Sequence, residues 1–119
     1  MEEKANQISE RFLAYAVEIV KITTLLRKTA TGREIAGQLV RSGTSAGANY
    51  EESRGAQSRA DFLHKLQIVL KELRESLFWL RLIQKSQILR DHELNPIIDE
   101  TRQLSNIIAK SVVTAKAKQ

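Results

Sequence analysis

Asp61 and His64 are the residues of this sequence that come nearest to a metal-binding pattern. They lie three positions apart, which is the carboxylate-to-histidine spacing found in di-iron helical bundles. Such bundles need the pattern twice, together with two further glutamates. The other histidine, His92, lies far along the chain, and cysteine is absent, so no thiolate site exists either. We therefore expect no metal site and no cofactor.

A second pattern pairs His64 with Arg59 and suggests a possible chemistry on RNA. The two residues have the loose Arg-x4-His spacing of HEPN-type helical ribonucleases, in which the arginine would stabilise phosphate charge and the histidine would move a proton. That spacing arises easily by chance, and no glycine-rich phosphate loop accompanies it. We expect no catalytic residue and keep a HEPN-like ribonuclease using Arg59 and His64 as the alternative.

The composition and the spacing of apolar residues predict an all-α protein. The chain has 119 residues and a single proline, and apolar residues recur at intervals of three and four throughout. Short connections favour an up-down-up-down antiparallel four-helix bundle. The expected helices cover about 3–29, 33–53, 58–85 and 92–114 of a single domain, 1–119.

The stretch RSGTSAGANYEES, residues 41–53, looks like a loop but continues the apolar period of the second helix. Gly32 is read as the turn residue before that helix. Glycine in a helix interior costs up to about 1 kcal/mol relative to alanine, yet Gly43 and Gly47 lie four apart. Together with Ala46 they form a smooth face, which predicts close packing against another helix.

The segment from Gly37 to Ile83 also carries a family pattern. The residues that match it are Leu39, Arg41, Ser42, Ser45, Asn49, Glu52, Ser58, Phe62, Lys65, Leu66, Lys71, Glu72, Glu75, Trp79 and Leu80. In these residues the chain resembles the bacterial four-helix-bundle family of proteins encoded in intervening sequences of 23S ribosomal RNA genes.

The resemblance implies a four-helix protomer in a homopentameric ring. A relative of the family, the accessory variability determinant of diversity-generating retroelements, works with a reverse transcriptase and binds nucleic acid. The implied partners are other copies of the chain, RNA or DNA, and a reverse transcriptase if the gene belongs to a retroelement. Most members have no assigned activity, and no catalytic residue carries over.

Three polar residues near the turn between the second and third helices are expected to fix its geometry. Asn49 and Glu52 are placed to hydrogen-bond across the turn, and Ser58 resembles the first residue of a capping box. Further along, Lys71 and Glu75 have the spacing of a surface ion pair.

Apolar residues outside the main helical stripes predict self-association. In the third helix the candidate subunit contacts are Ile68, Phe78, Trp79, Leu82 and Ile83. In the first helix Leu13, Val20 and Leu25 also lie outside the main face. A bundle of this size needs one buried stripe per helix, so a second stripe indicates a partner subunit. The alternative is a wide core face with scattered exposed apolar residues.

The distribution of charge predicts a basic end. The net charge is +5, and an up-down-up-down bundle gathers seven cations where the first helix joins the second and the third joins the fourth. They are Lys21, Arg27, Lys28, Arg33, Arg81, Lys85 and Arg90. Such an end would attract phosphate backbones without sequence preference, although solvated cations near helix C-termini are an equally good explanation.

These features together predict a non-catalytic, cytoplasmic scaffold or adaptor with electrostatic binding of RNA or DNA. No signal peptide is visible, and no window approaches the length of a membrane span, so no membrane partner is expected. A purely protein-binding module is the further alternative.

Overall fold

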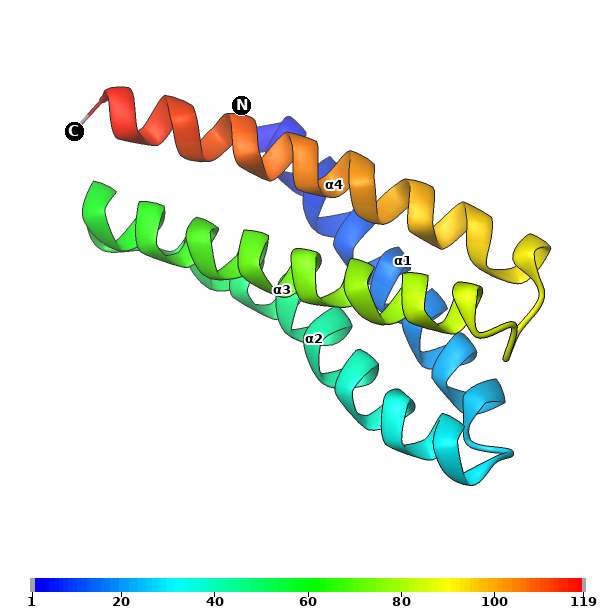
Figure 1. The fold of residues 1–119 in the computed structure, drawn as a ribbon. Coiled ribbons are helices and arrows are strands. Elements are labelled where there is room, and N and C mark those ends of the chain that lie inside the picture. Colours follow the sequence, from blue (N-terminus) through cyan, green and yellow to red (C-terminus); the bar gives the residue numbers. More distant parts are fainter. Residues whose placement is uncertain (1, 119) are drawn as a thin grey trace.

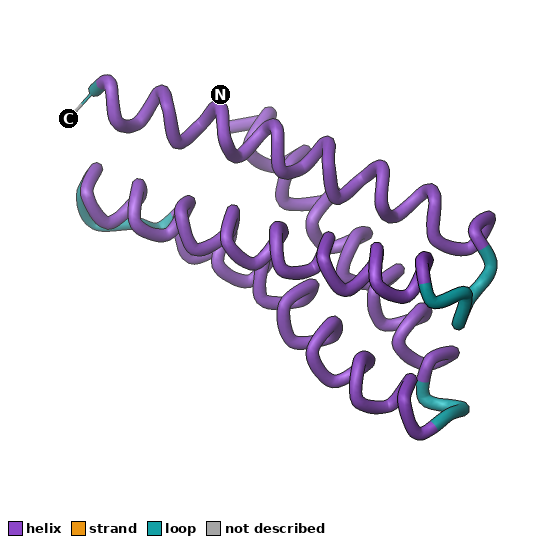
Figure 2. Tube along the Cα trace, in the orientation of Figure 1, coloured by secondary structure: helices purple, strands orange, loops and turns teal. Residues whose placement is uncertain are grey.

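The computed structural model describes residues 2–118, which form four α-helices joined by short connections (Figures 1 and 2). The helices are α1 (Glu2–Leu26), α2 (Ala30–Arg54), α3 (Arg59–Lys85) and α4 (Asp91–Ala117). They run up and down in sequence, so the α1–α2 turn and the α3–α4 loop lie at one end of the molecule, on the right in Figure 1. None of these four helices carries an apolar stretch long enough to cross a membrane. The expected all-α up-down bundle is confirmed.

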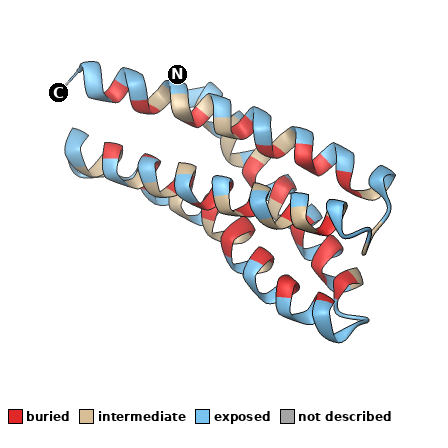
Figure 3. Ribbon diagram, viewed as in Figure 1, coloured by how far each residue is buried: buried red, intermediate tan, exposed pale blue. Residues whose placement is uncertain are grey.

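The core is built from the apolar stripes that the spacing predicts. In α1 the stripe from Phe12 to Leu26 is buried, and in α4 the stripe from Leu94 to Val112 is buried. Figure 3 shows these buried positions along the inward faces of the helices. Because each helix hides one stripe, the remaining apolar residues must lie on the surface or at its edge.

The start of α2 differs from the expectation, because the helix begins at Ala30 and not at Arg33. Thr29 caps it: the Thr29 hydroxyl accepts a hydrogen bond from the backbone N–H of Gly32 at 3.0 Å. A Cβ atom at Gly32 would overlap the carbonyl oxygen of Leu26. Gly32 is therefore required by the tight approach of two chain segments, inside the first turn of the helix rather than before it.

The glycine-rich stretch is continuous helix, and it lies directly against α1. A Cβ atom on Gly43 would come within 2.8 Å of the Ile19 side chain, and one on Gly47 would lie 3.1 Å from the Cβ of Phe12. Beside them Ala46 is fully buried. The small side chains of α2 thus allow the two helices to approach closely.

The contact between α1 and α4 is much smaller than the contacts between helices adjacent in sequence. It includes polar pairs: Arg11 Nη2 lies 2.6 Å from Glu100 Oε1, and the Tyr15 hydroxyl lies 2.8 Å from the hydroxyl of Thr101. The ion pair also raises the pKa of Arg11, through its hydrogen bond with Glu100. The result is an elongated molecule, 46 × 22 × 19 Å, in which α1 crosses α4 obliquely (Figure 1).

The close approach of α1 and α2 gives a prediction with a matched control. The substitution Gly43→Ala should lower the free energy of unfolding by about 1–3 kcal/mol, because its methyl group meets the stiff side chain of Ile19. At Gly37 a Cβ meets nothing within 4 Å, so Gly37→Ala should raise the free energy of unfolding by about 0.5–1 kcal/mol. Urea unfolding followed by circular dichroism measures both. Equal effects of the two substitutions would contradict close packing at Gly43.

Candidate functional site

Arg41 joins α2 to α3 through two carboxylates. Its Nη1 lies 3.3 Å from Glu72 Oε2, and its Nη2 also donates to Glu75. Glu72 is only 5% exposed, so its charge needs this partner. The recorded partners of Glu75 are Arg41 and Trp79, and the expected surface pair with Lys71 is therefore wrong.

The same ion-pair cluster holds an aromatic pair in place. The indole Nε1 of Trp79 donates to Glu75 Oε2 at 3.0 Å. The ring of Phe78 meets the ring of Trp79 edge-on, with centroids 5.1 Å apart and an interplanar angle of 77°. Trp79 is half-buried, whereas Phe78 is 60% exposed. An anchored indole therefore supports an exposed phenyl ring.

A layer of buried hydroxyl groups, one from each helix, crosses the middle of the bundle. Tyr15 bonds to Thr101 at 2.8 Å, and Ser42 bonds to Ser76 at 2.8 Å. Burial raises the pKa of Tyr15 to about 12, although hydrogen bonds with Thr101 and Ser76 act in the opposite direction. Buried hydroxyls are stable only with partners, so this layer favours one alignment of the four helices. Sequence reasoning missed it, because single serines and threonines on four separate helices carry no common signal.

Of the three residues expected to fix the α2–α3 turn, Ser58 makes the expected contact. The Ser58 hydroxyl accepts from the backbone N–H of Asp61 at 3.1 Å and caps α3. Glu52 faces Lys65 across the turn, with 3.9 Å between carboxylate oxygen and ammonium nitrogen. The expectation for Asn49 is corrected: its amide donates to the carbonyl and hydroxyl oxygens of Ser45, at 2.9 and 3.0 Å. Both atoms belong to α2, one turn back, so Asn49 stabilises its own helix.

All seven residues of the predicted basic end are exposed, and both chain connections that carry them lie at the same end of the bundle (Figure 1). Lys21 lies 3.5 Å from Glu18. Within residues 2–118, none of the other six forms an ion pair; these are Arg27, Lys28, Arg33, Arg81, Lys85 and Arg90. The guanidinium of Arg33 donates to the carbonyl oxygen of Arg27 at 3.4 Å. The opposite end differs, because Arg54 there binds Ser9, Glu2 and Asn6.

The predicted subunit contacts on α3 are corrected in part. Ile83 is fully buried and belongs to the protomer core. Ile68, Trp79 and Leu82 are half-buried, which leaves Phe78 as the prominent exposed apolar side chain of that set. Ile83 follows Leu80 by three residues and continues the buried stripe of α3, so its spacing could have placed it in the core.

The larger exposed apolar surface lies on α1. Leu13, Val17 and Val20 are 61%, 46% and 48% exposed, and their spacing of four and three residues places them on one face. Between α1 and α2, beside Leu13, lies a groove of about 550 Å³ whose lining includes Phe12, Ala16 and Ala48. Of this α1 stripe, Val17 was absent from the sequence-based prediction, although its spacing from Leu13 and Val20 could have identified it. Leu25 is half-buried.

Arg59 and His64, the two residues of the ribonuclease alternative, are both exposed. Arg59 Nη1 donates to the carbonyl oxygen of Lys118, 3.0 Å away at the end of α4. His64 is exposed on the following turns of α3. Over the described range 2–118, no three acidic or histidine side chains gather at a possible metal site.

The raised pKa of Tyr15 gives a testable dependence of stability on pH. Above about pH 10 the phenol of the unfolded chain loses its proton, whereas the folded protein keeps it until about pH 12. Rising pH therefore favours unfolding in this window. Between about pH 10 and pH 12 the unfolding free energy of the wild type should fall by about 2 to 3 kcal/mol more than that of Tyr15→Phe. Urea unfolding at a series of pH values measures the difference.

The control for this measurement is Tyr50→Phe. Burial also raises the pKa of Tyr50, but this residue is less enclosed and lies close to Arg54. Its substitution should therefore remove less of the alkaline loss of stability. Parallel pH profiles for the wild type and Tyr15→Phe would contradict the role given to the buried phenol.

Comparison with known proteins identifies the family. The family model described as 23S rRNA-intervening sequence protein matches residues 4–110. A crystal structure of a protein of unknown function, from the S23 ribosomal protein family of Bacteroides thetaiotaomicron VPI-5482, superposes with a TM-score of 0.84 at 32% identity. The match covers 88% of this chain and 97% of that chain. Curated proteins give no match. The predicted resemblance is confirmed, and the chain belongs to the 23S rRNA-intervening sequence protein family.

Proposed function

We propose that this protein is a non-catalytic, self-associating adaptor whose basic end binds RNA or DNA electrostatically. The observation that carries the proposal is the separation of two exposed surfaces. The apolar stripe Leu13, Val17 and Val20 lies along α1, and six cations that form no ion pair within residues 2–118 lie at one end of the bundle. One surface suits protein contact and the other suits a polyanion.

Self-association is supported by the character of the α1 stripe. Three large apolar side chains on one helical face have the spacing of a packing seam. The exposed charges on the same helix are of mixed sign, because Glu10 and Glu18 are accompanied by Lys21. A second copy of the chain could therefore pack against this apolar surface without repulsion between large patches of like charge. The family resemblance also leads us to expect contacts between copies of the chain, because it implies a ring-forming homo-oligomer.

Nucleic-acid binding is supported by the excess of cations at the basic end, where Glu34, Asp91 and Glu93 offset only three of the seven positive charges. Cations that already have carboxylate partners gain little from a phosphate, whereas unpaired exposed cations release counterions when a polyanion binds. Within the described residues 2–118, six of the seven cations form no ion pair, and only Lys21 has a carboxylate partner. The net charge of +5 adds long-range attraction for a polyanion.

The ribonuclease alternative has less support. A catalytic arginine must reach the phosphate that the histidine serves, and Arg59 instead bonds the last turn of α4. Incubating RNA with the wild type and with His64→Ala tests the alternative directly. Cleavage that depends on His64 would overturn the non-catalytic proposal.

The self-association proposal predicts that Val17→Glu reduces the solution mass. Light scattering of the wild type at micromolar concentration should give a multiple of 13.5 kDa, and Val17→Glu should shift the mass towards one subunit because it buries a charge in the contact. The matched control is Val113→Glu, since Val113 is exposed on α4 and lies outside the stripe. It should leave the mass unchanged. A monomeric wild type would contradict the proposal.

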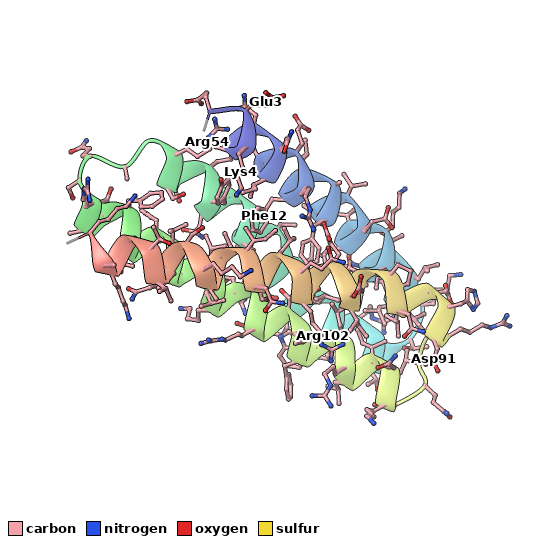
Figure 4. All side chains as sticks on the ribbon, turned by 90° about the horizontal axis from the view of Figure 1, so that it is seen from above. Glu3, Lys4, Phe12, Arg54, Asp91 and Arg102 are labelled. Atoms are coloured by element: carbon pink, nitrogen blue, oxygen red, sulfur yellow. The ribbon has the colours of Figure 1, made fainter. Side chains whose placement is uncertain are left out.

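The nucleic-acid proposal predicts binding that weakens as salt increases. For a labelled single strand, the logarithm of affinity should fall linearly with the logarithm of salt concentration, by about 0.7 per phosphate contact. The double variant Arg27→Gln/Lys28→Gln should make this slope shallower by about 1.4. Lys4→Gln is the control, because Lys4 lies near the start of α1, at the end of the molecule away from Asp91 and the basic end (Figure 4). Binding that is absent at low salt, or independent of salt, would leave a purely protein-binding module.

A further inference from the structure

We propose that the outer face of α3 is a track for a single-stranded polynucleotide, with Phe78 stacking on a base. The inference rests on the proposed nucleic-acid binding and extends it from the basic end along one helix. The track consists of four cations around one aromatic ring: Lys71, Arg74, Phe78, Arg81 and Lys85, all of them exposed. Its last two cations are shared with the basic end.

The five residues of the track share one helical face. Their spacing is three, four, three and four residues, which keeps them within about 80° of arc on a helix of 3.6 residues per turn. From Lys71 to Lys85 the face extends for roughly 21 Å along α3. No acidic residue of α3 shares this arc, since Asp61, Glu72 and Glu75 lie around the helix towards its other neighbours.

Glu72 and Glu75 do not neutralise the track, because both pair with Arg41 of α2. Glu75 also accepts a hydrogen bond from Trp79. Within residues 2–118 the four cations of the track form no ion pair. Their charge is therefore available to phosphates, and each contact would release a counterion.

Phe78 supplies what the basic end alone lacks, a surface on which a base can stack. Its ring is 60% exposed and is held edge-on by Trp79, 5.1 Å away, which the carboxylate of Glu75 fixes. An aromatic ring in a basic groove is the combination that single-strand binding proteins use, because every base has a face that can stack. In a duplex those base faces are already stacked on each other, so the track selects single strands.

A second copy of the chain fits this face less well. Four cations of one sign surround Phe78, and a partner there would need matching acids to avoid repulsion. The α1 stripe, with its mixed charges, is better suited to that contact. The α3 track and the α1 stripe are thus separate surfaces that separate substitutions can test.

The test compares three Phe78 variants with labelled oligo-U RNA and oligo-dT DNA of equal length. Phe78→Leu keeps an apolar side chain but removes the ring, and should weaken binding to both strands by about 5- to 150-fold with an unchanged salt slope. Phe78→Trp keeps a stacking face and should retain wild-type affinity, and Phe78→Ala should match Phe78→Leu. Inorganic polyphosphate has no bases, so its binding should not respond to Phe78→Leu.

Charge variants test the rest of the track. Lys71→Gln/Arg74→Gln lies outside the basic end and should make the salt slope shallower by about 1.4, whereas Lys4→Gln should not.

Each contrary outcome has a separate meaning. Salt-dependent binding that is lost in Arg27→Gln/Lys28→Gln but unchanged in Lys71→Gln/Arg74→Gln and Phe78→Leu overturns the track and keeps the basic end. A changed solution mass in Phe78→Leu, with unchanged affinity, makes Phe78 a subunit contact and overturns the stacking role. Duplex binding as tight as single-strand binding also overturns it. No binding by the wild type at low salt overturns the proposed function itself.

Discussion

The ion pairs of Arg41 with Glu72 and Glu75 are the interaction on which the exposed surfaces depend. They hold α2 against α3 at a place where Glu72 is nearly buried, and removing one partner would leave a buried charge uncompensated. They also engage the acids that would otherwise neutralise α3. The outer face of α3 is positive because Glu72 and Glu75 lie on another side of the helix, where Arg41 of α2 pairs with them.

Many of the residues that carry the family pattern lie along this same α2–α3 contact. Arg41 meets Glu72 and Glu75, Ser42 meets Ser76 beside them, and Glu52 faces Lys65 at the turn. These contacts join the two helices, and they position the surfaces that α2 and α3 expose.

Apolar spacing was sufficient to predict the four helices and most of the core, because a 3-4 repeat specifies which face is buried. It could not identify Thr29 as the cap of α2, since the first helix was expected to extend to about residue 29 and Gly32 was read as the turn residue. It misplaced Ile83, whose neighbours are half-exposed, and overlooked Val17. The hydroxyl layer could not be predicted for a different reason. Its bonds join residues far apart in sequence, such as Tyr15 and Thr101, and only the three-dimensional structure brings them together.

The short connections have a consequence for how the chain folds. Three links of three to five residues join neighbouring helices, so most interhelical contacts close small loops and the contact order is low. Each hairpin can form with little loss of chain entropy. The hydroxyl contact of Tyr15 with Thr101 spans 86 positions, so forming it costs more chain entropy than forming a contact between neighbouring helices. The docking of the last helix against the first is thus the step expected to come late, after neighbouring helices have paired.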